Sequence, residues 1–204
     1  MNEADRLKKR DHRAREIQFR DGLLIALLSV WPIRRRSLAS ITVAGHVARS
    51  GDSVTLLLHE RDTKSRRCSA YQVPERLLPY VTQYLDQVRP RLMGARVTDS
   101  FWISYQGGTL SADGIYVTVR KRIVTAFHRE MGLHDFRRAA TTFIAMEAPE
   151  AVGLIPSVLQ HASPEVSQRH YNLARSSAAS RRFTSLIVQR RRAAKQVRRE
   201  KRER

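Results

Sequence analysis

The residues that could do chemistry gather between positions 133 and 172. His134 and Arg137 lie three residues apart in a predicted helix, so their side chains emerge on one face. His161 closes a later apolar segment, and Tyr171 follows ten residues after it as the last tyrosine of the chain. Cationic and hydrogen-bond-donating groups beside one nucleophilic hydroxyl suit phosphoryl transfer, because fixed donors stabilise the charge that develops on the nonbridging oxygens.

The order of these residues resembles the signature of the tyrosine recombinases, also called phage integrases. That signature has His-x-x-Arg, then Leu-Gly-His, then a tyrosine. The corresponding residues here are His134-Asp-Phe-Arg137, Leu159-Gln160-His161 and Tyr171. Glutamine replaces the glycine that the family favours before the second histidine. The resemblance covers residues 21–188 and implies an α+β, mostly helical catalytic domain with a small three-stranded antiparallel sheet.

The same resemblance assigns an arginine early in the chain. In tyrosine recombinases an apolar helix ends in a short turn that carries the first catalytic arginine. Aligning residues 31–34 on that turn selects Arg34, with Arg35 and Arg36 as alternates. Three adjacent arginines alone would more often form a solvated patch. The family often has glutamate three residues after this arginine, where the present chain has Ser37.

A catalytic lysine is expected in the predicted sheet. Apolar residues recur with a period of two, with turn residues between, which predicts strands at about 41–48, 53–60 and 66–73. Lys64 falls in the turn between the second and third strands. A lysine in a β-turn is most often only solvated. The family, however, keeps a mobile catalytic lysine in this hairpin, commonly after threonine, as in Thr63-Lys64 here.

The resemblance implies DNA strand cleavage without a metal or nucleotide cofactor. Tyr171 would attack a backbone phosphate and form a 3′-phosphotyrosyl enzyme, and the 5′-hydroxyl that leaves would later attack from a different strand. Because the phosphodiester energy is stored in the covalent intermediate, no energy cofactor is needed. Lys64 would protonate the leaving 5′-oxygen, since a flexible ammonium group can serve as a general acid.

The other four residues would surround the phosphate. Arg34 and Arg137 would hold its nonbridging oxygens, because a guanidinium offers paired donors that match a phosphate. His134 would assist proton transfer at the tyrosine, and His161 would donate a hydrogen bond to the phosphate. Each of these residues taken alone more often has a structural or solvated role. The inference therefore rests on the ordered set.

Two alternatives remain open at this point. One is a topoisomerase-like enzyme that relaxes DNA without exchanging strands. The other is a DNA-binding remnant of an integrase that keeps the fold but does not cut, an alternative that Ser37 and Gln160 leave open. The leading interpretation is a site-specific recombinase of the integrase type, acting in DNA integration or recombination of a mobile genetic element.

The charge of the chain supports a DNA partner. The net charge of +19 predicts a polyanionic partner, which the resemblance narrows to double-stranded DNA. Residues 1–20 are expected to form a charged N-terminal arm and residues 189–204 a basic C-terminal tail. Between them, residues 21–188 carry twenty-two basic and thirteen acidic residues and keep a net charge of +9. The predicted catalytic domain is thus basic without its ends.

The family also predicts an assembly. Its members act as tetramers on two DNA duplexes and often pass a C-terminal segment to a neighbour, so a homo-oligomer, a tetramer on DNA, is expected. The apolar cluster in residues 183–188 is the expected contact. Family members usually carry an upstream helical domain that closes a clamp on DNA, whereas twenty polar residues precede residue 21 here. A domain of a longer protein, a truncated product and a minimal form are the open explanations.

The length and composition of the chain limit the class of protein to which it can belong. With 204 residues the chain can hold one good-sized domain. The single cysteine excludes an internal disulfide and a cysteine zinc cluster, and it fits a reducing compartment. The longest apolar run, residues 23–33, is too short to span a bilayer. These features predict a soluble, cytoplasmic protein with no membrane partner. His46, His59 and His128 lack metal-ligand spacing and are interpreted as structural or solvated.

The helices around the site are predicted from the proline, glycine and capping residues at their ends. A buried helix at residues 21–30 ends before Pro32, because proline disfavours helix in the preceding residue. A second helix is expected from Pro74 to about residue 88, followed by a loop at 89–99. A third runs from an N-cap at Ser111 to residue 131, with a glycine C-cap at 132. A fourth covers residues 134–147.

Overall fold

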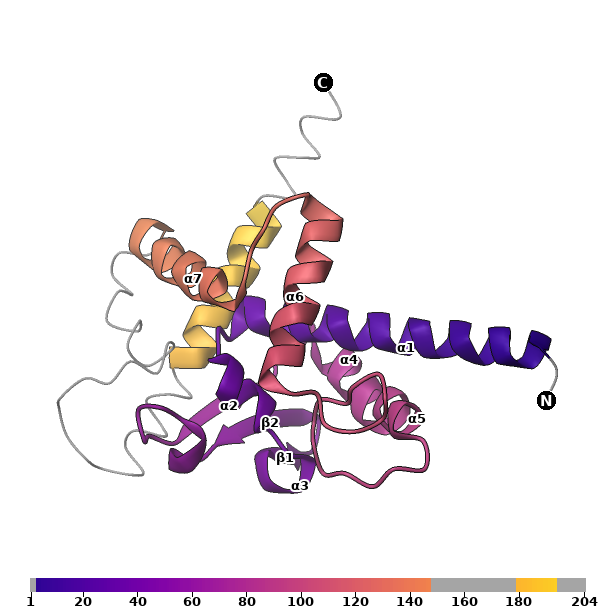
Figure 1. Cartoon of the computed structure of the whole chain (residues 1–204). Helices are drawn as coiled ribbons and strands as arrows, with labels where there is room; N and C mark the ends of the chain where they lie inside the picture. The colour runs from indigo at the N-terminus through magenta and orange to yellow at the C-terminus, as the bar shows by residue number, and fades with distance from the viewer. Residues whose placement is uncertain (1–2, 148–178, 194–204) are drawn as a thin grey trace.

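The computed structural model describes residues 3–147 and 179–193 of the chain (Figure 1). The first helix, α1, runs without a break from Glu3 to Val30, and its first turns project from the body of the molecule. Its buried stripe includes Leu23, Leu24, Leu27 and Leu28. The helix ends where Trp31 N–H donates to the carbonyl of Leu27 at 2.7 Å and proline follows. The predicted helix at residues 21–30 is therefore the buried end of a longer one.

A three-stranded antiparallel sheet follows, in the order β1-β2-β3. Its strands are β1 (Val47–Ser50), β2 (Ser53–Leu58) and β3 (Ser69–Gln72). Leu56 lies opposite Val47 on one side and Tyr71 on the other. Alternate residues of β2 are buried, as the period of two predicted. The predicted fold class, mostly helical with a small antiparallel sheet, is confirmed.

The first predicted strand is wrong over most of its length. Thr42 forms an isolated bridge with Ser100, and a short helix, α3 (Val43–His46), precedes β1. The Thr42 hydroxyl caps this helix by accepting a hydrogen bond from Gly45 N–H at 3.2 Å. A cap of this kind leaves the alternation of apolar residues unchanged, so the pattern alone could not show it.

The helical segment after the sheet continues beyond the predicted end near residue 88. It comprises α4 (Leu78–Gln83), a π-helical turn η2 (Tyr84–Val88) and α5 (Arg89–Met93). The buried Arg89 side chain donates to the carbonyls of Ser100 and Thr98, at 2.9 and 2.6 Å. These bonds hold the start of α5 against the next loop, and the chain leaves the helix at Gly94, where φ is +60°.

The helix α6 spans Ala112–Phe127. Its predicted N-cap is confirmed, because Ser111 Oγ accepts from Gly114 N–H at 3.1 Å. Its predicted end is wrong, since His128 takes the left-handed conformation (φ 53°, ψ 31°) that glycine 132 was expected to supply. Gly132 instead lies just before α7 (Leu133–Glu147), where its N–H donates to Asp135 Oδ2 at 2.8 Å.

An aromatic core holds these elements together. Tyr84, Phe101 and Trp102 are fully buried and pack with ring centroids 4.7 to 5.6 Å apart. Trp31 packs on Tyr71 of β3 at 5.6 Å, which attaches the end of α1 to the sheet. In the described part of the chain no helix is both long and apolar enough to cross a membrane.

Candidate functional site

A cavity of about 1100 Å³ opens between α2 (Arg35–Ala39), the loop between β2 and β3, α6 with the segment that follows it, and the start of α7. Its lining is rich in cations. Seven lining residues are basic and three are acidic: Arg34, Arg35, Arg36, Arg61, Lys64, Arg120 and Arg137 against Asp62, Glu130 and Asp135. Such an excess of positive charge in a concave site attracts an anionic ligand.

Four of the six predicted site residues line this cavity, namely Arg34, Lys64, His134 and Arg137. They come from three segments of the chain that the fold brings together: the turn before α2, the β2–β3 loop and the first turns of α7. The other two, His161 and Tyr171, lie outside the described residues. The structure thus brings together every predicted site residue that it describes.

Arg34 is the N-cap residue of α2 and has extended backbone angles (φ −65°, ψ 141°). A tight turn precedes it, in which Ile33 N–H donates to the carbonyl of Trp31 at 2.7 Å. The alternate Arg35 is engaged elsewhere: it donates to Asp113 Oδ1 at 2.9 Å and its guanidinium lies 5.8 Å from the centre of the Tyr116 ring. Arg36 is exposed at the rim. These contacts favour Arg34 over Arg35 as the inner arginine.

Arg137 is buried and fixed. Its Nη1 donates to the carbonyl oxygen of Pro32 at 2.7 Å, and its side chain is 8% exposed. Burial first, and then the positive charge of Arg34, lower the pKa of Arg137 to about 10, with a smaller opposing effect of Tyr71. Arg137 therefore stays charged at neutral pH, close to another cation. A bound anion would relieve this repulsion.

The start of α7 adds a second feature that favours an anion. Gly132 and Leu133 line the cavity together with His134, whose side chain is exposed. The first N–H groups of a helix have no partners within the helix, and they carry partial positive charge. Asp135 accepts one hydrogen bond there, from Gly132 N–H. His134 thus stands as a proton donor or acceptor at the positive end of a helix.

Lys64 is exposed on the loop that connects β2 and β3. That loop begins with the short 3-10 helix η1 (Glu60–Asp62). The buried Thr63 closes the loop: its hydroxyl accepts from Arg67 N–H at 3.0 Å and donates to the Arg67 carbonyl at 2.9 Å. Lys64 therefore has an exposed side chain on a backbone that these hydrogen bonds hold in place.

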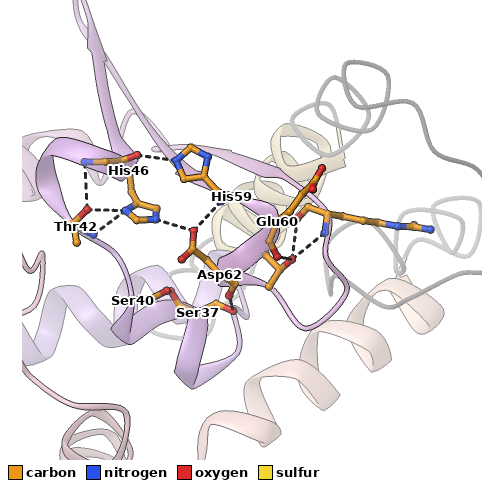
Figure 2. A network of polar contacts seen from close by, with 10 residues as sticks. Ser37, Ser40, Thr42, His46, His59, Glu60 and Asp62 are labelled. Carbon is orange, nitrogen blue, oxygen red and sulfur yellow. Dashed lines mark hydrogen bonds and ion pairs between the residues drawn. The ribbon is translucent and has the colours of Figure 1, made fainter.

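Sequence reasoning missed the contacts behind this loop, which Figure 2 shows. Ser37 is buried, and its hydroxyl donates to the carbonyl of Asp62 at 2.5 Å. His46 Nε2 lies 2.9 Å from Asp62 Oδ2. The partners are 25 and 16 residues apart in the chain, so no local spacing could have revealed them. His46 is indeed a structural histidine, as expected, but it supports the candidate site.

Nothing in the described residues groups three or more His, Cys, Asp or Glu side chains in a way that could hold a metal ion. The arrangement can bind a phosphate-sized anion through guanidinium groups and helix N–H groups. It can also present one lysine and one histidine for proton transfer.

No protein-family model matches the sequence. A curated relative, the tyrosine recombinase XerD of Chlorobaculum tepidum, is 28% identical over 110 residues. This match covers 50% of the present chain and 36% of that protein.

Two solved structures share the fold. One is the XerH site-specific recombinase bound to difH substrate in a pre-cleavage complex, with a TM-score of 0.57, 18% identity and coverage of 80% of this chain and 47% of that chain. The other is the XerH post-cleavage complex with a palindromic difH substrate, with a TM-score of 0.56, 18% identity and coverage of 95% and 51%. The present chain thus spans about half, or less, of the proteins that it matches.

Proposed function

Because this chain is a distant relative of the tyrosine recombinases in sequence and in fold, we propose that it is an integrase-type DNA strand transferase. It would cleave and rejoin strands of double-stranded DNA through a 3′-phosphotyrosyl intermediate, without metal. The observation that carries this proposal is the convergence of Arg34, Lys64, His134 and Arg137 on one cationic cavity. His134 and Arg137 were selected from the sequence by the family signature. Arg34 was selected by its place in the turn after the apolar helix, and Lys64 by its place in the predicted hairpin.

The two arginines would bind the scissile phosphate. Arg137 is oriented by its bond to the Pro32 carbonyl, and Arg34 lies two residues after Pro32 in the chain. Donors that are fixed before the reaction stabilise developing charge without reorganisation. Burial is the main cause of the lowered pKa of Arg137, and the charge of Arg34 lowers it further. A phosphate between the two groups would remove that second, repulsive contribution.

Proton transfer would involve Lys64 and His134. Lys64 would give its proton to the 5′-oxygen as the bond from phosphorus to that oxygen breaks. His134 would assist the removal of the tyrosine proton. Tyr171 as the nucleophile and His161 as a phosphate donor lie outside the described residues, and their roles rest on the family signature. The homo-tetramer on DNA remains part of the same proposal.

A covalent capture experiment tests the function without a known target site. The protein is incubated in chelator with a pool of nicked duplexes of random sequence, and DNA that stays attached after denaturation is sequenced. We expect enriched sequences for the wild-type protein and none for Arg137→Lys. A pool that is bound but never attached would contradict strand cleavage, and it would favour a DNA-binding remnant that does not cut.

A further inference from the structure

We propose that His46 and Asp62 form a positioning pair that holds the Lys64 loop over the cavity. This inference rests on the proposed function, because it assigns to the pair an effect on proton donation by Lys64. Neither residue needs to touch the DNA. Figure 2 shows the pair within a network that joins α2, α3 and the β2–β3 loop.

Asp62 is the centre of this network and is tied to three partners. Its Oδ2 lies 2.9 Å from His46 Nε2 and accepts from His59 N–H at 3.1 Å. Its backbone carbonyl accepts the hydroxyl proton of Ser37 at 2.5 Å. One residue therefore attaches the loop both to α3 and to α2, the helix that begins after Arg34.

The neighbours of His46 determine which of its ring nitrogens carries the proton. Thr42 N–H can only donate, and its nitrogen lies 3.0 Å from His46 Nδ1, so Nδ1 accepts. The proton of the neutral ring is then on Nε2, which donates to Asp62. The Thr42 hydroxyl lies 2.8 Å from the same Nδ1. The His46 side chain is 5% exposed as well, so its orientation is set by hydrogen bonds and by packing.

A second bond ties the same loop to α3. His59 Nε2 lies 2.9 Å from the carbonyl of Gly45, which can only accept, so His59 donates. The rings of His46 and His59 pack with centroids 5.2 Å apart. The loop is therefore anchored immediately before η1, at Asp62, and again by the bonds between Thr63 and Arg67. Lys64 is an exposed residue that directly follows Thr63, within the segment that these last bonds close.

Backbone anchoring matters for this lysine because its side chain is long and mobile. A general acid must come within hydrogen-bond reach of the atom that it protonates. A misplacement of about 1 Å can cost on the order of 10²-fold in rate. A fixed backbone limits the positions that the Lys64 ammonium group can reach in the cavity that it lines with the two arginines. Without Asp62 and His46 it would range over more positions.

The test uses two versions of a nicked duplex that carries a captured sequence. In one the scissile bond joins phosphorus to the 5′-oxygen, and in the other a sulfur atom replaces that oxygen. When tyrosine attacks the first, the oxygen leaves with a proton from Lys64. When it attacks the second, the phosphorus–sulfur bond breaks and a thiolate leaves without needing a proton, because thiols ionise near pH 8.5.

We expect Asp62→Ala and His46→Ala to cleave the oxygen substrate about 10²-fold more slowly than the wild type. Their cleavage of the sulfur substrate should stay within about 3-fold of the wild type, as should that of Lys64→Ala, because the step that needs the acid is bypassed. His46→Gln keeps a donor toward Asp62 and should restore most of the activity. Asp52→Ala, in the exposed turn between β1 and β2, is the matched control and should cleave both substrates normally.

An equal loss on both substrates would overturn the positioning role, because a general distortion of the site slows both. Normal cleavage of both by the alanine variants would overturn it as well. If an alanine variant does not fold, as judged by thermal unfolding, Asp62→Asn is tested by the same comparison. If the wild-type protein captures no sequence from the random pool, the proposed function itself is contradicted, which separates that failure from failure of the positioning pair.

Discussion

The guanidinium of Arg137 donates a hydrogen bond of 2.7 Å to the carbonyl oxygen of Pro32. The two residues are 105 positions apart, and the bond joins the start of α7 to the turn that carries Arg34. The relative positions of the two arginines are thus set by a direct contact between their own segments. This contact makes the phosphate-binding part of the proposed site a single unit, and it can be tested by substitution.

Replacing Arg137 by lysine should damage both stability and cleavage. Lysine keeps the charge but not the planar fork of donors, so it cannot hold Pro32 and a phosphate together. We expect the free energy of unfolding to fall by about 1–3 kcal/mol, since a buried hydrogen bond to a charged group is lost. Urea denaturation measures this change. Cleavage should fall by about 10²-fold or more.

Arg138→Lys is the matched control for that substitution, because Arg138 is exposed and its ion pair with Asp135 is long, at 3.8 Å. It should leave both measurements near the wild-type values, as exposed ion pairs contribute little. If both variants behaved alike, the special position of Arg137 would be refuted.

Replacing Arg34 by glutamine should slow cleavage without lowering the stability of the fold. The charge of Arg34 helps to lower the pKa of Arg137, so its removal relieves a repulsion in the folded protein. We expect the free energy of unfolding at pH 7 to stay within about 0.5 kcal/mol of the wild type, or to rise. Cleavage should fall by about 10²-fold or more. A clear destabilisation in denaturant would contradict this account of the two arginines.

Sulfate should stabilise the protein by binding between Arg34 and Arg137, and this gain should depend on pH. Because the pKa of Arg137 is lowered to about 10, the folded protein loses that charge at a pH at which the unfolded chain still keeps it. The rise in melting temperature with sulfate should therefore be constant from about pH 6 to 9 and should decline as the pH approaches about 10. If sulfate raised the melting temperature of Arg34→Gln by the same amount, sulfate would bind at another site.

DNA binding should weaken steeply with salt. Each phosphate contact contributes a slope of about −0.9 in the plot of log affinity against log salt concentration. Arg36 is exposed at the rim of the cavity, so Arg36→Gln should reduce this slope by about one. Arg91 is exposed on α5, where it pairs with Glu16 at 3.8 Å, and Arg91→Gln should leave the slope unchanged. Tight binding that is insensitive to salt would refute the phosphate-contact model.

Local patterns predicted most of the fold. The period of two gave the sheet, Ser111 marked the start of α6, and the spacing in residues 133–147 matched α7. The missed features are a local helix cap within a strand-like pattern and an unusual backbone angle. Thr42 caps a helix inside a strand-like pattern, and His128 takes a left-handed conformation that a glycine was expected to adopt.

The candidate site, like the fold, could be predicted only in part from the sequence. The resemblance to the family selected four residues that the structure brings to one cavity, and their catalytic roles stay predictions. Ser37 was noted only as the replacement of a family glutamate. In the structure its hydroxyl reaches the carbonyl of Asp62, a contact across 25 residues. Hydrogen bonds at such separations have no signal in a single sequence, which is why the support of the Lys64 loop was missed.

The central claim is that Tyr171 becomes covalently attached to DNA. The most direct measurement is to incubate the protein with a captured nicked duplex in chelator, digest the adduct and locate the attached nucleotide by mass spectrometry. We expect a phosphotyrosyl nucleotide on Tyr171, and no adduct for Tyr171→Phe. An adduct on any other residue, or no adduct with a DNA that the protein demonstrably binds, would contradict it.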